Sequence, residues 1–522
     1  MNKAFRIIRS KAIKALNKFP KGYFIKSHME PNKQTEAPKT ETPAFYDREI
    51  IQSTTKDTIS FNKLSEIDNR FADKEVTIRV RLHSSRVKGN LAFLVLRQNL
   101  HTLQAVAFKS AEVPKEMIKF IGGVEKESIV DITGILKAVD QEIKTCSIKN
   151  YELQIKKFIV VSRSSNVLPF QLEDATRKVI REGEEESTVD GLPTVKLNTR
   201  LDNRYIDMRT PANQAIFKIQ SGVCMLFREY LMKEQFMEIH TPKLLGGSSE
   251  GGSEVFSFDY FGKKGCLAQS PQLYKQMMIM ADFERVFEIG PVFRAEKSFT
   301  HRHLCEFTGL DAEMQIKEHY YEILEIIGNL FNHIFRGLEA RFAKELEVIN
   351  EQFEFKPFKF SDKPLILTYE EGVALLKENG INQDVLEDLS TETEKTLGKL
   401  VKEKYDTDFY ILHRYPTSAR PFYTMLCKDD PRFTCSYDVF MRGQEIISGA
   451  QRIHVPELLK ERAEAKGIPP HTIQDYIDSF KFGAYPHGGF GIGLERVVML
   501  YLDFIDIRQS TAFPRDPVRL NP

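Results

Sequence analysis

The alternation of hydrophobic and polar residues is clearest in Phe287–Met314, where it predicts two strands joined by a charged loop. Successive side chains of a strand point to opposite faces. The second strand therefore has a core face of Thr308, Leu310, Ala312 and Met314 and an opposite face of Phe307, Gly309, Asp311 and Glu313. Carboxylates on a strand face cost stability unless they bind a partner. We expect the second of these faces to line a binding site.

The loop between these two strands is rich in charged and titratable side chains, namely Arg294, Glu296, Lys297, His301, Arg302 and His303. Such a group suits a polyanion. The alternative is a solvated hairpin tip, which explains the loop charges but not the carboxylates of the strand.

Upstream of this hairpin, helical spacing predicts a helix over Gln214–Lys233, followed by a strand that ends at Pro242. The glycine–serine stretch Gly246–Phe256 surrounds Glu250, and glycine this dense favours a mobile lid over a linker. A second helix begins at Ser270–Pro271. Residues from about 316 to 405 are predicted to form a helical insertion without chemistry of its own.

The run Tyr437–Ile453 predicts a hairpin that turns at Arg442–Gly443 and places Asp438 and Glu445 on either side of the turn. Strict alternation puts Ser448 on one face and Glu445 on the other. They converge only if a bulge interrupts the strand, and Gly449 is not well placed for one. Oxygen ligands of this kind suit Mg²⁺ that bridges phosphates.

The segment His487–Leu502 predicts a glycine-rich loop that leads into a helix, with Arg496 in the first turn. The dinucleotide-binding GxGxxG pattern is matched only superficially, because no apolar strand precedes the loop and too little chain follows for a βαβ unit. An arginine beside the free N–H groups of a helix start can instead hold a phosphate.

The N-terminal part of the chain has a different pattern. Short strand-like runs at regular spacing predict a small closed barrel over residues 56–167, of which the OB type is the commonest nucleic-acid version. Phe93 is either an exposed stacking platform for a base or part of the core. A polar, acidic hinge follows over residues 168–205, and a larger domain occupies residues 206–522.

Residues 1–55 form a basic extension and linker, whose first acidic residue is Glu30. Apolar residues recur there at helical spacing, which suits a phosphate-binding helix, an organelle targeting segment or a loose tail. Of these three, we favour phosphate binding.

Composition excludes few classes of protein. Lys and Arg number 74 against 73 for Asp and Glu, so a nucleic-acid partner must be met by local patches and not by a global charge. The six cysteines form no CxxC pair, which favours reduced thiols in a cytosol-like compartment. No apolar run approaches the length of a membrane helix, and we expect no membrane partner.

Three segments, in order, carry a resemblance to a known family: FRAE with its returning strand HLCEFTGLDAEM, the strand EIISGAQR, and GIGLER. They resemble motifs 2 and 3 of class II aminoacyl-tRNA synthetases, and the helix and strand closed by Pro242 resemble motif 1. Together with the barrel, the chain from about residue 58 resembles aspartyl-tRNA synthetases of the eukaryotic and archaeal cytosolic type. The implied fold is α+β, an OB barrel followed by an antiparallel-sheet catalytic domain flanked by helices.

The resemblance implies ligation of L-aspartate to tRNA(Asp) through an aspartyl-adenylate, with ATP as substrate, Mg²⁺ as cofactor, a homodimer and a cytoplasmic location. Organelle targeting by residues 1–30 stays open. The implied catalytic residues are Arg294, Glu445 and Arg496. The implied ATP site adds Glu296, Arg302, His303, Phe307 and Gly493 to these three. The implied Mg²⁺ ligands are Asp438, Glu445 and Ser448.

For aspartate, the resemblance implies contacts from Ser249, Glu250, Gln272, Lys275, Arg294, Asp311, Ser448, Arg452 and His487. Lys275 and Arg452 match the cations for the substrate's side-chain carboxylate, which must be paired when buried. For the anticodon, the implied residues are Arg86, Phe93, Gln104 and Glu173.

Other interpretations are an asparagine-specific synthetase, a tRNA-free amidating relative and a tRNA-binding protein without catalysis. Lys275 argues against the first, the barrel against the second, and the ATP-site residues Arg294, Glu445 and Arg496 against the third.

Overall fold

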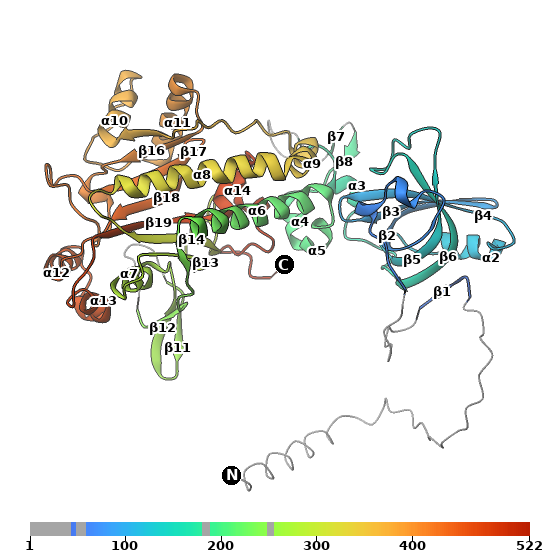
Figure 1. The fold of residues 1–522 in the computed structure, drawn as a ribbon, viewed down its shortest axis with the longest axis horizontal. Helices are drawn as coiled ribbons and strands as arrows, with labels where there is room; N and C mark the ends of the chain where they lie inside the picture. The colour runs from blue at the N-terminus through green and yellow to red at the C-terminus, as the bar shows by residue number, and fades with distance from the viewer. Residues whose placement is uncertain (1–42, 49–58, 180–187, 190, 248–254, 522) are drawn as a thin grey trace, which may run out of the picture.

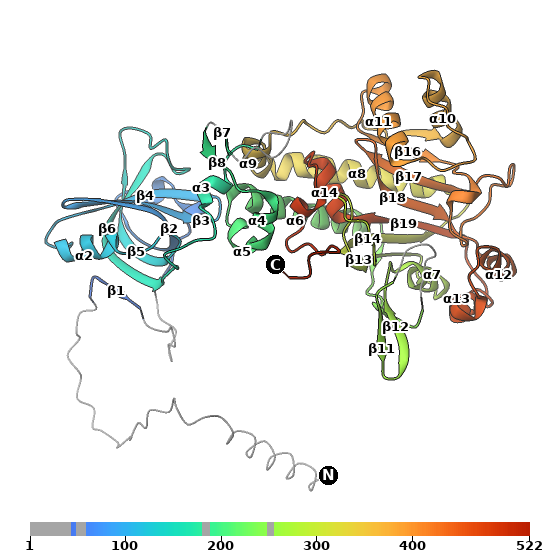
Figure 2. The ribbon, with the colours of Figure 1, turned by 180° about the vertical axis from the view of Figure 1, so that it is seen from behind.

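A computed structural model describes residues 43–48, 59–179, 188–189, 191–247 and 255–521. It has an N-terminal barrel and a larger domain built on one wide sheet (Figures 1 and 2). The predicted helix of the basic extension lies outside the described residues, as do Ser249 and Glu250. No helix within the described ranges is long and apolar enough to cross a membrane.

The barrel confirms the predicted OB architecture. Its strands are β2 (Glu75–Lys88), β3 (Leu91–Gln98), β4 (His101–Phe108), β5 (Ile129–Ala138) and β6 (Tyr151–Ser162), and α2 (Lys115–Gly122) packs on β2 and β3. The sheet closes because β6 pairs with both β4 and β5. A short strand that the sequence did not reveal, β1 (Phe45–Asp47), joins β6 in parallel from within the predicted extension.

One buried carboxylate joins the barrel to the larger domain. Glu127, 3% exposed at the end of the barrel core, accepts hydrogen bonds from Arg97 at 2.8 Å and from Arg209 at 2.9 Å. Arg97 belongs to β3, whereas Arg209 stands just before the first long helix of the larger domain. The predicted hinge between them holds α3 (Leu172–Ala175), β7 (Thr188–Val189), β8 (Leu192–Pro193), α4 (Leu197–Asp202) and α5 (Arg204–Asp207).

The larger domain is an eight-stranded sheet in the order β15-β16-β17-β18-β19-β14-β13-β9. The strands are β9 (Met237–Glu238), β13 (Arg285–Phe293), β14 (Glu306–Gln315), β15 (Leu365–Thr368), β16 (Phe409–His413), β17 (Ser436–Met441), β18 (Gln444–Gln451) and β19 (His487–Gly493). All neighbours are antiparallel except at the two edges. Leu310, Ala312 and Met314 pack into the core with α6 (Pro211–Lys233), α8 (Tyr321–Arg341) and α14 (Leu494–Tyr501), which confirms the predicted core face of β14 except at the half-buried Thr308.

Smaller elements surround this sheet (Figure 1), and the one that continues from α8 packs against α6. They are β10 (Leu244–Leu245), β11 (Ser257–Tyr260), β12 (Lys263–Leu267), α7 (Gln272–Met280), α9 (Ala343–Phe353), α10 (Tyr369–Glu378), α11 (Thr391–Tyr405), α12 (Pro456–Ala465) and α13 (Gln474–Ser479).

Two predictions from the sequence differ from this architecture. The predicted helical insertion also contains the strand β15, because an apolar run of four residues is too short to identify as a strand by periodicity. Its helix α8 belongs to the core of the domain. The glycine-rich stretch from His487 to Gly493 is a strand and not a loop. Its glycines allow close approach of its neighbours, since a Cβ at Gly489 would stand 2.1 Å from the carbonyl oxygen of Ala312.

Candidate active site

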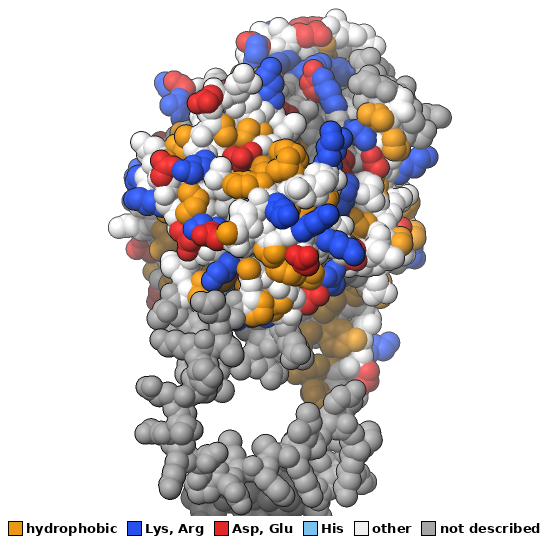
Figure 3. All heavy atoms as spheres, turned by 90° about the vertical axis from the view of Figure 1, so that its right-hand side faces the viewer, with side chains coloured by type: hydrophobic (Ala, Val, Ile, Leu, Met, Phe, Trp, Pro, Cys, Tyr) orange, Lys and Arg blue, Asp and Glu red, His pale blue; other side chains and the backbone are white. Residues whose placement is uncertain are grey.

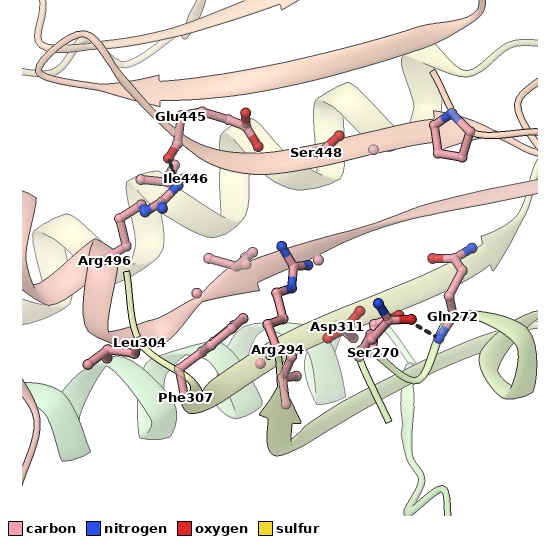
Figure 4. A pocket seen from close by; sticks show the side chains of 18 of the residues that line it. Ser270, Gln272, Arg294, Leu304, Phe307, Asp311, Glu445, Ile446, Ser448 and Arg496 are labelled. Carbon is pink, nitrogen blue, oxygen red and sulfur yellow. Dashed lines mark hydrogen bonds between the residues drawn. The ribbon is translucent and has the colours of Figure 1, made fainter. Parts of the chain in front are cut away.

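A cavity of about 490 Å³ lies on the face of the sheet opposite the core face of β14. The predicted binding face of β14 supplies Phe307, Gly309 and Asp311 to it, because these residues alternate with the core residues. Figure 4 shows Arg294, Phe307 and Asp311 on one side, with Glu445 and Ser448 across the cavity on β18. The hairpin therefore lines a cavity, whereas the tip of its loop at residues 297–301 is exposed, and its role as a binding surface stays a prediction.

One end of the cavity has the shape of a slot beside an aromatic ring. The guanidinium of Arg294 lies 5.6 Å from the centre of the Phe307 ring. A Cβ at Gly493 would lie 3.9 Å from that ring, so the glycine keeps the space beside it open. Arg496 is held in place because it donates to the carbonyl oxygens of Glu445 at 3.1 Å and Arg302 at 3.3 Å.

The charged loop completes this end of the cavity. Glu296, Arg302 and His303 all line it. Arg302 is tied to α11, since it donates to the hydroxyl of Thr391 at 3.1 Å. Hydrogen bonds from Ser298 hold the pKa of Glu296 below its usual value, so this side chain is a carboxylate acceptor at neutral pH. The ATP-site residues predicted from the sequence are therefore brought together.

The other end of the cavity holds paired charges. Asp311 lines the cavity, and its carboxylate accepts from the Lys275 ammonium at 3.0 Å. Lys275 is 2% exposed and lies behind the cavity wall, where it also donates to the carbonyl oxygen of Phe490. Gly309 and Gly491 flank Asp311, and a Cβ at either would stand 3.0 Å or less from its carboxylate oxygens. The two glycines thus make room for the Asp311 carboxylate at the cavity wall.

Glu313, to which the sequence assigned no ligand, organises the charges beneath this end. Arg452 donates to it through Nε at 2.9 Å and Nη2 at 3.1 Å, and Lys275 lies 3.6 Å away. Burial alone would raise the pKa of Glu313, but Arg452 and Lys275 outweigh it and hold the pKa below its usual value. Glu313 therefore stays ionised and fixes the two cations.

Three further residues that were predicted to contact the substrate aspartate differ in position. Gln272 and Ser448 line the cavity with Arg452. His487 does not; it is fully buried behind the wall, with its ring nitrogens 2.7 Å from the carbonyl oxygen of Tyr485 and 3.1 Å from the side chain of Gln276. Burial lowers the pKa of His487 to about 4, so it is neutral and supports the wall.

The hairpin of β17 and β18 contains the bulge that convergence requires, but not at Gly449. Val439 pairs with Ile447 and Phe440 with Glu445, so Ile446 is the extra residue. The bulge restores Glu445 to the face of Ser448, which stands directly opposite Asp438. Gly449 has another role: a Cβ there would lie 2.2 Å from the Tyr437 ring.

Asp438 has a partner that the sequence did not reveal. Arg420, 7% exposed, donates to both Asp438 carboxylate oxygens at 2.8 and 2.6 Å and to the Ser448 hydroxyl at 2.8 Å. Burial and the charge of Asp438 raise the pKa of Glu445 to about 7. Mg²⁺ needs only one or two carboxylates when phosphates and water supply its other ligands. Glu445 and Ser448 face the cavity and fit that role, although Ser448, like Asp438, would have to share its oxygen with Arg420.

Glu394 on α11 is a second acidic residue missed from the sequence. Burial and the nearby Glu445 and Asp438 raise its pKa to about 8. At helical spacing among charged neighbours it looked like a solvated surface residue, and only the packing of α11 against β18 reveals its place.

The predicted anticodon residues lie on the barrel and just beyond it. Phe93 is 43% exposed and pairs across β2 and β3 with Arg86, so its interpretation as a core residue is wrong. Gln104 donates to Glu152 at 2.5 Å, and Glu173 accepts from Lys126 at 3.2 Å. In Figure 3 this end of the molecule shows hydrophobic side chains among Lys and Arg side chains. Such a mixture suits an unstacked nucleic-acid strand.

Comparisons with known proteins agree with this architecture. A model of the family described as "tRNA synthetases class II (D, K and N)" matches residues 196–517, and one described as "OB-fold nucleic acid binding domain" matches residues 76–161. The cytoplasmic aspartate–tRNA ligase of Rattus norvegicus is 52% identical over 473 residues, 91% of this chain and 93% of that protein. The chain belongs to the aspartyl-tRNA synthetases. It is accordingly a class II aminoacyl-tRNA synthetase, an enzyme.

Solved structures separate this synthetase from its asparagine-specific relatives. The aspartyl-tRNA synthetase of Entamoeba histolytica superposes with a TM-score of 0.83 at 44% identity, covering 95% of this chain and all of that one. The asparaginyl-tRNA synthetase of Pyrococcus horikoshii, complexed with asparaginyl-adenylate, gives a TM-score of 0.76 at 28% identity, covering 89% and 100%. The fold is shared, and the higher identity favours aspartate.

Proposed function

We propose that this synthetase activates L-aspartate with ATP to aspartyl-adenylate and then transfers the aspartyl group to the 3′-terminal adenosine of tRNA(Asp). The observation that carries the proposal is the division of one cavity into two ends, with Arg294 between Phe307 and Asp311 (Figure 4). An aromatic slot beside two arginines suits adenine and its phosphates, and a pair of cations set on a buried carboxylate suits a small acid.

Each residue of the first step acts by binding and orienting. Phe307 stacks on the adenine ring, Glu296 accepts from the adenine amino group, and Arg496 covers the other face of the base and meets the γ-phosphate. Arg302 and His303 contact the outer phosphates. Arg294 binds both the α-phosphate and the attacking carboxylate of aspartate, and thereby stabilises the charge that develops as they react.

The amino acid is selected by charge at the other end. Arg452 binds the side-chain carboxylate, Lys275 attracts it from behind the cavity wall, and Asp311 and Gln272 accept from the α-ammonium group. An asparagine side chain would bring a neutral amide where these cations favour a carboxylate, and an amide N–H group that faces cations is left without an acceptor, which is costly in a buried site. We therefore expect aspartate to be preferred.

Glu445 and Ser448 would hold Mg²⁺ at the phosphates, with Asp438 as a further ligand. When bound, Mg²⁺ neutralises phosphate charge and orients the phosphates. We further propose that Arg86, Phe93, Gln104 and Glu173 contact the anticodon, that the chain works as a homodimer, and that it is cytoplasmic like the relatives named so.

ATP–pyrophosphate exchange tests this proposal when it is measured with each amino acid in turn. We expect exchange with aspartate only, followed by charging of tRNA(Asp). Exchange with asparagine and not with aspartate would overturn the assigned specificity. No exchange with any amino acid would favour a tRNA-binding protein without catalysis.

A further inference from the structure

Arg420 occupies groups that would otherwise be free for a metal ion. It comes from the connection between β16 and β17 and reaches the cavity wall, where its two terminal nitrogens fork onto Asp438 and one of them also meets Ser448. Bidentate pairs of this kind are among the strongest that proteins make. A cation of the protein itself therefore holds two of the three predicted metal ligands.

Packing on a buried aromatic ring fixes the position of Arg420. Its guanidinium lies 3.9 Å from the centre of the Tyr415 ring, and that tyrosine is 1% exposed. The next residues of the same connection, including Tyr423 and Thr424, also line the cavity, and Thr424 forms a bridge with Arg452. Arg420 is thus built into the wall and is not a surface side chain that happens to fold over the site.

Cationic groups of the protein lie beside the predicted metal ligands. Asp438 and Glu445 bring two carboxylates, with Glu394 and Asp388 nearby, and Arg420 and Arg496 bring two guanidinium groups. A divalent cation that enters alone meets these two positive charges, whereas a cation that arrives with the phosphates of ATP brings its own anions. Within the described part of the chain, no hydrogen-bond donor reaches the Glu445 carboxylate, which leaves it available to such a complex.

We propose that Arg420 is a positioning residue that suppresses binding of a divalent cation in the absence of ATP and holds Asp438 and Ser448 ready for the metal–nucleotide complex. The inference rests on the proposed adenylation and extends it to the order in which ligands enter. Removing the arginine charge should release Asp438 and make the site attractive to the metal alone.

The test measures binding of Mn²⁺ alone, followed by the electron paramagnetic resonance signal of the free ion. We expect Arg420→Met to bind Mn²⁺ about tenfold more tightly than the unaltered protein, because one positive charge is lost beside two carboxylates. The same variant should bind ATP more weakly when no metal is present. Arg420→Lys, which retains the charge, should leave the Mn²⁺ affinity near that of the unaltered protein.

Arg414→Met is the matched control, since Arg414 lies in the same connection but pairs with the exposed Asp429. It should leave Mn²⁺ binding unchanged. Unchanged or weaker Mn²⁺ binding by folded Arg420→Met would overturn the inference, because a merely structural arginine predicts a general loss.

A second variant covers the case in which Arg420→Met does not fold. Asp438→Asn leaves the Arg420 charge uncompensated, so affinity for ATP without metal should rise about tenfold. Absence of that rise would count against the inference. Absence of aspartate-dependent exchange by the unaltered chain would instead refute the proposed function.

Discussion

Arg452→Lys offers a sharp test of how the aspartate end works. The arginine uses Nε and Nη2 on Glu313, and Nη2 again on the carbonyl oxygen of Gly489 and, at 3.5 Å, on the side-chain oxygen of Gln272. Among the described residues, none accepts from its Nη1, which is left for the substrate carboxylate. A lysine keeps the charge but has one nitrogen, so it cannot serve Glu313 and a substrate in this geometry.

The expected loss of affinity for aspartate follows from the energy of the hydrogen bond that the substitution removes. A hydrogen bond to a charged group contributes about 1.5–3 kcal/mol. At about 1.4 kcal/mol per factor of ten, the loss of one such bond raises the KM for aspartate about 10- to 150-fold. The ATP end is untouched, so the KM for ATP should change less than about threefold.

ATP–pyrophosphate exchange at varied aspartate and varied ATP measures both constants. Arg414→Lys is the matched control, because its partner Asp429 is largely exposed and exposed pairs contribute little. A melting curve shows whether the variant is folded. Equal changes in both KM values, or no change in that for aspartate, would refute the assigned role of Arg452.

Three further changes test other parts of the molecule. Phe93→Ala should raise the KM for tRNA by about tenfold, as expected for loss of 1–3 kcal/mol of base stacking, and leave pyrophosphate exchange unchanged; equal damage to both would mean that Phe93 supports the fold. Burial raises the pKa of Glu495 to about 7 from about 4.5, so the folded protein holds this proton more tightly and loses about 3 kcal/mol of stability as pH rises from 4.5 through 7. The stabilising effect of Glu495→Gln should therefore grow between pH 5 and pH 8, as measured by melting temperature, and a constant difference would contradict the shift. Glu127→Gln leaves Arg97 and Arg209 without a carboxylate, and a broken buried ion pair costs about 3–5 kcal/mol, so the melting temperature should fall clearly. Charging of tRNA should fall more than pyrophosphate exchange does. Equal losses in the two activities would argue against a role of Glu127 in joining the domains.

The sequence was most informative where a single strand carried the signal. The alternation of Phe307, Gly309 and Asp311 with Leu310 and Ala312 predicted the cavity wall, because the period of a strand depends only on its own backbone. The strands of the barrel and α6, the long helix before β9, were predictable from the sequence for the same reason.

The features that the sequence did not reveal depend on contacts between distant segments. The bulge at Ile446 depends on how β18 pairs with β17, and no local pattern marks it. Arg420 lies 18 residues before Asp438, in a connection without periodicity, so nothing in the sequence links the two. Glu394 belongs to a helix whose charged residues look alike until α11 is packed against the sheet.

The single extra residue in β18 has a consequence for how this chain tolerates change in length. Removing Ile446 would restore regular alternation and still leave Glu445 on the face of Ser448, because Ile446 is the residue that has no partner on β17. Replacing Ile446 with another apolar residue leaves the count, and thus the direction of Glu445, unchanged. Neither a deletion nor a substitution at this position therefore reverses the direction of Glu445, and a deletion removes only the bulge with its local twist.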